Sequence, residues 1–236
     1  MRKVIVLIAV LALVAIGTMV ACGRRQPAVA AAPPTPAAGA PAAATLGFGA
    51  DVVDSAPLGW SVHSHGAGRP AHWAVVASDG VGQVLQQSDE DTTNHRYNLA
   101  LAPSAPVADV RVTAHARAVR GGRDRSFGVV ARWQEGDSYY LVRCNTSGWG
   151  SNVRIYRFTK GEREELASTE VDAVPGTWYD LAIEVRGDRL LAIFNGQQVL
   201  ALQDAQLTGP GRTGVWTKCE SVSQFANVAV VPLGAP

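Results

Sequence analysis

The chain has 236 residues, 47% of them hydrophobic and 17% charged, and its 21 basic and 20 acidic side chains leave a net charge of +1. This balance excludes the basic surface expected of a nucleic-acid-binding protein and predicts no polybasic attraction to anionic lipid. The length allows one domain with a sizeable core.

The N-terminus has the pattern of a bacterial lipoprotein signal peptide. Arg2 and Lys3 form a basic start, residues 4–20 are almost wholly apolar, and small residues precede Cys22. A basic start, an apolar run and small residues before a cleavage site are typical of a secretory signal. We expect residues 1–21 to be removed and Cys22 to be lipidated. The alternative is an uncleaved membrane helix, because the apolar run approaches the roughly 20 residues that a membrane span needs.

The expected processing places the rest of the chain outside the cytoplasm on a tether. Gly occupies position 23, where some bacteria use Asp to retain lipoproteins at the inner membrane, so we expect the outer membrane or the cell surface. Cleavage removes two of the 21 basic residues and none of the 20 acidic ones, which leaves a charge of about −1. Residues 22–45 are mostly Ala and Pro, with no large apolar groups to offset the entropy of ordering, and predict a disordered, semi-extended tether.

Residues 46–236 show strand patterns throughout. Short alternating or apolar runs lie between turn residues, and the run at 109–119 alternates cleanly. Two turn signals, Lys160-Gly161 and Asn195-Gly196, are typical of hairpins. The predicted strands cover residues 72–78, 83–88, 96–102, 109–119, two strands within 126–145, 152–159, 165–168, 178–186, 189–194, 197–202, 212–220 and 223–231. This pattern predicts an all-β fold, an antiparallel two-sheet jelly-roll sandwich.

Two segments carry polar and aromatic side chains between their apolar positions. In residues 126–145 and 214–220, alternate positions are apolar or small, and the positions between them hold Arg, Asn, Lys, Glu, Tyr and Trp. Successive side chains of a strand point to opposite faces, so one face would build the core and the other would gather the polar groups. We expect a function to lie on that second face.

The order of several segments resembles the concanavalin A-like lectin/glucanase superfamily. The resemblance is carried by Trp60 and Trp73, followed by the runs YYLVRCN at 139–145, VRIYRFTKG at 153–161, GTWYDLAIEV at 176–185 and GRTGVWTK at 211–218. Among its members, bacterial secreted domains of the 3-keto-disaccharide hydrolase-like and laminin-G-like type are the most similar. The resemblance implies a jelly roll of two curved sheets that handles carbohydrate on its concave face or at the rim.

The alternation predicts which residues would form a carbohydrate site. Aromatic rings can cover the C–H faces of a sugar while polar side chains bond its hydroxyl groups. The predicted ligand-binding residues are Arg132, Tyr139, Arg143, Asn145, Trp216, Lys218 and Glu220. The alternative is a solvated sheet face with cross-strand ion pairs.

Catalysis is less favoured than binding. Glucanases of this fold carry alternating carboxylates on one strand, as Glu-x-Asp-x-Glu or Glu-x-Asp-x-x-Glu, and neither pattern occurs here. We therefore expect a membrane-tethered lectin-like domain that binds a glycan or cell-wall component without a cofactor. The alternatives are a hydrolase acting on glycosides or 3-keto-glycosides in the same cleft, and a structural envelope lipoprotein.

The remaining cysteines and histidines give two further expectations. Cys144 and Cys219 fall on the expected core side, and export permits a disulfide between them, with two buried free thiols as the alternative. His63, His65 and His72 could ligate a metal, but nearby Gly and Pro residues indicate a loop with surface histidines. We expect no metal site.

Overall fold

The computed structural model describes residues 43–147 and 150–234. The expected signal peptide, Cys22 and all but the last residues of the tether lie outside the described residues. Within those ranges, no helix has the length and apolar character needed to cross a membrane.

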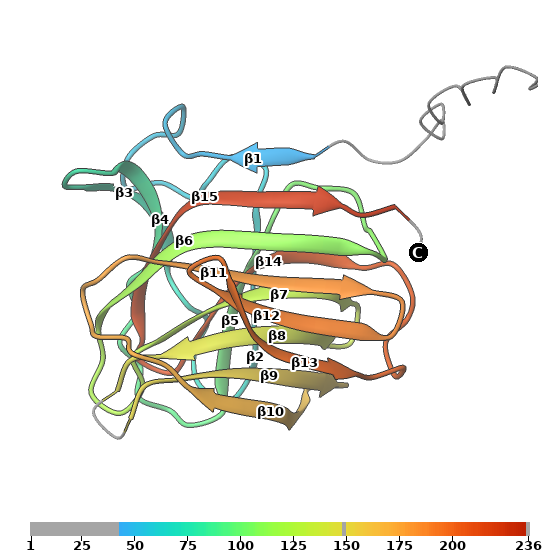
Figure 1. Ribbon diagram of the computed structural model, residues 1–236. Helices are drawn as coiled ribbons and strands as arrows, with labels where there is room; N and C mark the ends of the chain where they lie inside the picture. Colours follow the sequence, from blue (N-terminus) through green and yellow to red (C-terminus); the bar gives the residue numbers. More distant parts are fainter. Residues whose placement is uncertain (1–42, 148–149, 235–236) are drawn as a thin grey trace, which may run out of the picture. The chain divides into compact units, whose positions relative to one another are not determined.

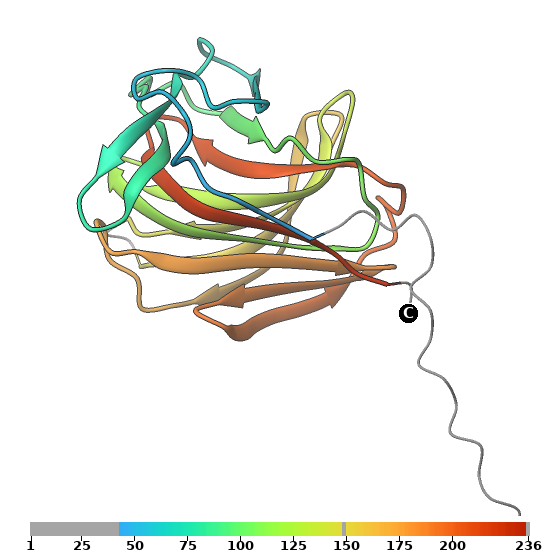
Figure 2. The same ribbon diagram turned by 90° about the horizontal axis from the view of Figure 1, so that it is seen from above.

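The described chain forms two antiparallel sheets packed face to face (Figures 1 and 2), which confirms the predicted sandwich. In spatial order, sheet A contains β13 (Gln197–Gln203), β12 (Arg189–Phe194), β11 (Tyr179–Arg186), β6 (Val110–Arg120), β15 (Val222–Pro232), β4 (Gly82–Gln87) and β3 (Trp73–Ser78), and β1 (Ala44–Leu46) also pairs with β15. Sheet B contains β10 (Glu162–Glu170), β9 (Asn152–Thr159), β8 (Ser138–Asn145), β7 (Ser126–Gln134), β14 (Arg212–Lys218), β5 (Arg96–Leu101) and β2 (Ser61–Gly66).

The main core lies between the sheets and follows the predicted alternation. On β6, every second residue from Val110 to Ala118 is buried in this core, while the residues between them point to the outer face of sheet A. Val142 of β8 and Ile183 of β11 are fully buried in the same core. The predicted hairpin turns also form, because Lys160 and Asn195 adopt positive φ angles of 51° and 49° and each precedes a glycine with positive φ.

Two strands of the structure, β1 and β2, were not predicted from the sequence. β1 has three residues, too few for a visible period, and β2 carries the His63-x-His65 segment that was expected to be a loop. Gly66, which made this segment look irregular, ends β2 with a φ of 82°. A glycine that terminates a strand therefore has the same sequence signature as a glycine within a loop.

The predicted disulfide between Cys144 and Cys219 is wrong: both cysteines are buried free thiols. Cys144 lies on β8 and Cys219 directly follows β14, and β7 lies between these two strands. Residues two strands apart are separated by about 10 Å between Cα atoms, beyond the ~7 Å limit for a disulfide. Cys219 also leaves the strand alternation in a turn with a φ of 49°, so only Cys144 belongs to the main core.

Candidate functional site

Sheet B curls so strongly that its two edges approach each other across its outer face. In spatial order β2 is five strand spacings from β9, which would be about 24 Å in a flat sheet. Yet the ring of His65 on β2 lies 5.5 Å from that of Phe158 on β9 and 5.7 Å from that of Tyr139 on β8. The outer face of sheet B is therefore concave, as the resemblance implied.

A second hydrophobic cluster fills the middle of this concave face. Its ten buried members are Tyr97, Leu99, Leu101, Val130, Trp133, Tyr139, Leu141, Tyr156, Phe158 and Trp216. The rings of Tyr139 and Phe158 stack at 4.3 Å, and those of Tyr97 and Trp216 at 6.0 Å. The centre of the concave face is thus a packed core of its own.

All seven predicted ligand-binding residues are buried. Tyr139 and Trp216 point to the outer face, as the alternation predicted, but both are fully buried in the second cluster. The Trp216 indole donates a hydrogen bond to the Tyr139 hydroxyl at 3.2 Å. Arg143, on the same face, keeps only 5% of its surface exposed. These three residues therefore do not form an open platform.

The other four predicted residues are engaged in contacts that hold the fold. Arg132, at a β-bulge, donates to two backbone carbonyls and to Asp109. The Asn145 side chain accepts a backbone hydrogen bond two residues along. Lys218 forms a buried ion pair with Asp124 at 2.8 Å, and Glu220 accepts two backbone N–H groups. In the sequence, polar residues that make such buried contacts alternate with apolar residues in the same way as polar residues on a solvated sheet face. The alternation therefore could not distinguish the two.

The histidines of β2 cover one side of the filled concave face. His63 Nε2 lies 2.6 Å from a carboxylate oxygen of Asp137, in the β7–β8 turn, and His65 Nε2 lies 2.8 Å from the Tyr139 hydroxyl. Burial lowers the pKa of His65 to about 4; the neighbouring His63 adds to this shift and Asp137 opposes it. The His65 imidazole is therefore neutral at pH 7.

An open cavity of about 250 Å³ remains on the concave face beside these histidines. It is lined by Gly66, His95, Tyr97, Gly161, Glu162 and Arg163. The Arg163 guanidinium lies over two tyrosine rings, 5.6 Å from the centre of Tyr97 and 5.0 Å from that of Tyr156. Among the described residues, Arg163 has no hydrogen-bond or ion-pair partner. Its guanidinium is therefore held over the two tyrosine rings by cation–π contacts alone.

Another cavity lies on the outer face of sheet A, over β6, β11, β12 and β13. It encloses about 490 Å³ and is lined by Arg111, Thr113, Asp180, Ala182, Leu191, Ile193, Gly196 and Gln198. Its charges pair with neighbouring groups: Arg111 with Glu184, and Asp180 with His115 at 2.7 Å. The two charged side chains that line this cavity, Arg111 and Asp180, therefore already have partners of opposite charge.

One buried cluster has metal-ligand chemistry. Ligand atoms of Asp124, Cys219 and Glu220 all lie within 4.8 Å of one another. One carboxylate is already paired with Lys218, and the other holds the backbone of Arg123 and Asp124. These contacts give the cluster a structural role in fixing the loop before β7.

The cavity residues His95, Glu162 and Arg163 were not singled out in the sequence. Arg163 lies before the predicted strand at residues 165–168, whereas the observed strand β10 already begins at Glu162. The sequence indicates the place of Arg163 only through its distance from the turn, because Arg163 pairs in register with Phe158 across the β9–β10 hairpin. That register could have been derived from the Lys160-Gly161 turn.

Comparison with known proteins places the fold. No family model matches this chain, and no curated protein matches its sequence. Among solved structures, the carbohydrate binding module CBM66 from Bacillus subtilis has a TM-score of 0.59 and 19% identity, covering 73% of this chain and 95% of the module. The exoplasmic/lumenal domain of VIP36, in a Ca²⁺/Man-bound form, has a TM-score of 0.55 and 10% identity, covering 82% and 91%.

A prokaryotic β-1,3-1,4-glucanase (lichenase) from a mouse hindgut metagenome is also similar, with a TM-score of 0.51 and 11% identity, covering 81% of this chain and all of the enzyme. The fold is therefore a jelly-roll sandwich of the concanavalin A-like and galectin-like kind. More particularly, it is a sandwich whose concave face is filled at the centre and open at a cavity between β5 and the β9–β10 turn.

Proposed function

We propose that this protein binds a glycan in the cavity on the concave face of sheet B, as a domain tethered to the bacterial envelope through Cys22. The observation that carries this proposal is the tyrosine floor beneath Arg163, with His95 and Glu162 at its rim. An apolar floor with a few polar groups around it is the usual design of a small-ligand site. Similarity to a carbohydrate binding module and to a Man-bound domain supports a sugar as the ligand.

The cavity can open at little energetic cost. Arg163 is held over the tyrosines by cation–π contacts, which contribute about 0.5–1 kcal/mol each at exposed sites. When Arg163 moves aside, the ring of Tyr97 becomes available to a sugar. The volume of about 250 Å³ is smaller than the roughly 300–1,000 Å³ of typical ligand sites, which favours the end of a glycan over a long internal segment.

A glycan array probed with the full-length chain in mild detergent tests this proposal. The variant His95→Asn keeps the positive φ of 59° at this position, because Asn tolerates that conformation. Combined with Glu162→Gln, it should weaken binding about tenfold. The matched control is Arg111→Gln in the sheet A cavity, which should bind as the parent does. Absence of glycan binding, or its loss in the control variant instead, would contradict the proposal.

The lipid anchor has its own test. Radiolabelled palmitate should be incorporated by bacteria that express the parent chain, and the Cys22→Ala variant should remain unlabelled. Equal labelling of both chains, or of neither, would show that Cys22 is not the site of anchoring.

A structural envelope role is the second candidate, favoured by the burial of all seven predicted ligand residues. The two functions predict different results in a strain that lacks this protein. If the role is structural, the His95→Asn/Glu162→Gln variant should restore any envelope defect as well as the parent does. If glycan binding is needed, this variant should fail to restore the envelope defect.

A hydrolase is the third candidate, favoured by the His63–Asp137 contact. An imidazole oriented by a carboxylate is suited to general acid–base catalysis, and the two atoms are 2.6 Å apart with both side chains partly exposed. Hydrolysis of a 3-keto-glycoside that is lost in His63→Ala, with glycan binding retained, would establish this activity. No turnover by the parent chain would reject it.

A further inference from the structure

Three arginines from three adjacent strands converge on one tyrosine of the concave face. The guanidinium carbons of Arg143 on β8 and Arg163 on β10 lie 5.5 Å and 5.0 Å from the centre of the Tyr156 ring. Arg154 on β9 places a nitrogen 3.4 Å from the Tyr156 hydroxyl. This group, Arg143, Arg154 and Arg163, is called the arginine cluster below.

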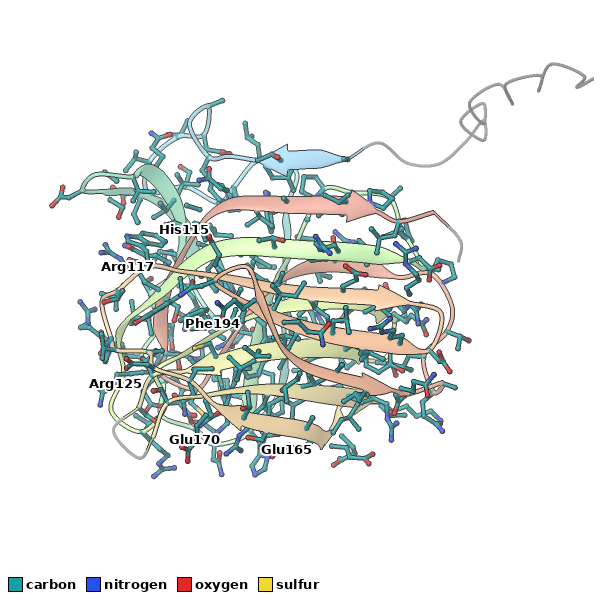
Figure 3. The ribbon with its side chains drawn as sticks, in the orientation of Figure 1. His115, Arg117, Arg125, Glu165, Glu170 and Phe194 are labelled. Carbon is teal, nitrogen blue, oxygen red and sulfur yellow. The ribbon has the colours of Figure 1, made fainter. Side chains whose placement is uncertain are left out.

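The arginine cluster places like charges against each other. Arg143 and Arg154 are direct register partners across the β8–β9 pair. Like charges directly opposite each other on neighbouring strands are destabilising. Among the carboxylates nearby, Glu165 pairs with Arg154 at 2.8 Å, on the β10 edge seen in Figure 3, and Asp124 is paired with Lys218. Glu162 lines the cavity with Arg163, so two carboxylates remain for the three guanidinium groups. The described residues thus leave an excess of positive charge here.

Donor groups in the arginine cluster are also unsatisfied. Among the residues that the structure describes, Arg143, which is 5% exposed, donates one hydrogen bond, to the Asn152 side chain at 3.0 Å, and its Nε has no partner. Within the same residues, the Nε of Arg154 is also buried without a partner. Buried donors without acceptors are costly, and most buried polar groups in folded proteins are paired. Hydrogen-bond acceptors with negative charge would satisfy these donors and also offset the excess positive charge.

We propose that the glycan bound by this protein is acidic and that Arg154 and Arg163 bind its carboxylate or sulfate groups; this proposal rests on the glycan-binding function proposed above. The forked donors of a guanidinium match the paired oxygens of such groups. Arg163 also lines the cavity over Tyr97, so one residue joins the sugar floor to the anion site. An anion between Arg154 and Arg163 would relieve the repulsion in the arginine cluster.

The test uses matched glycans that differ only in charge. The probes are polygalacturonate and its carboxyl-reduced neutral form, and chondroitin sulfate and its desulfated form, each titrated against the full-length chain in mild detergent. The two pairs separate carboxylate from sulfate recognition. We expect at least one acidic probe to bind about tenfold more tightly than its neutral counterpart, with affinity falling as salt rises.

Two half-exposed arginines are suitable for substitution without removing the buried Arg143. Arg154→Gln and Arg163→Gln should each weaken binding of the acidic probe about tenfold, the size of one charge-assisted hydrogen bond or more. Arg163→Lys should retain part of the affinity. Arg111→Gln, which removes an arginine already paired with Glu184 on the other sheet, is the control and should change nothing. Urea unfolding of each variant checks that the fold is intact.

The outcomes separate the two proposals. Equal affinity for the charged and neutral forms, insensitive to salt and to both Gln variants, overturns acidic recognition and leaves glycan binding in place. Failure to bind any probe or any array glycan overturns both. Loss of acidic-probe affinity in Arg111→Gln alone would move the site to sheet A and overturn the role of the arginine cluster.

Discussion

Substituting Trp216 by Ala separates the packed interpretation of the concave face from an open binding platform. Trp216 is fully buried, stacks on Tyr97 at 6.0 Å and donates to Tyr139 at 3.2 Å. A buried tryptophan covers about 150–250 Å², which at about 25 cal/mol per Å² gives roughly 4–6 kcal/mol. Partial collapse of the neighbouring rings reduces this loss, and Trp→Ala changes in cores cost about 3–5 kcal/mol. We expect about 4 kcal/mol.

Urea unfolding, followed by tryptophan fluorescence and circular dichroism, measures this loss. A stability change of about 4 kcal/mol in a domain of this size corresponds to a fall in Tm of roughly 10 °C. The variant Trp216→Phe keeps most of the apolar volume and should lose only about 1–2 kcal/mol. If Trp216→Ala loses less than 1 kcal/mol but abolishes glycan binding, Trp216 is a ligand contact and the packed interpretation is wrong.

Three further predictions follow from burial. Because burial lowers the pKa of His65 in the folded state to about 4, its contribution to stability is complete above pH 6.5 and is lost as the pH falls toward 4. The whole pKa shift corresponds to about 3 kcal/mol of unfolding free energy, and partial solvation of the ring reduces this to about 1–2 kcal/mol. In the His65→Gln variant, the free energy of unfolding measured in urea should no longer show this fall between pH 6.5 and pH 4. Burial raises the pKa of Cys144 to about 12 and also that of Cys219, so both thiols should react with Ellman's reagent only on unfolding, and reductant should leave Tm unchanged. Gly214→Ala would place its Cβ 2.2 Å from the backbone oxygen of Ala100 and should cost about 2–4 kcal/mol in thermal unfolding; a neutral effect would show that β5 and β14 can separate.

Local patterns were sufficient for much of the fold. The alternation on β6 and the turns at Lys160-Gly161 and Asn195-Gly196 predicted strands, faces and hairpins, because each depends on a few consecutive residues. The outward direction of Tyr139 and Trp216 was also correct. The face on which each strand residue lies is therefore largely encoded by its neighbours in sequence.

The depth of the concave face could not be obtained in the same way. Whether an outward Trp216 meets solvent depends on the curl of sheet B, which brings β2 to β9 across five strand spacings. The pattern of one strand carries no information about that curl. The cysteine pairing failed for a related reason: strand order places β7 between β8 and β14, and Cys219 lies in the turn after β14, where the strand alternation has ended. The alternation along a strand predicts on which face of the sheet a residue lies. The distance between two residues on that face depends on the order of the strands, which the alternation does not give.

The three-residue strand β1 determines how the sandwich would respond to a pulling force. Its pairing runs from Ala44 with Val230 to Leu46 with Val228, and among the described strands it pairs with β15 alone. β15 is also held along its length by β6, so detachment of β1 leaves the centre of sheet A paired (Figure 1). A force applied through the chain before Ala44 would therefore detach β1 from β15 first. The loss of this short strand would lengthen the chain under load while the core of the sandwich stays folded.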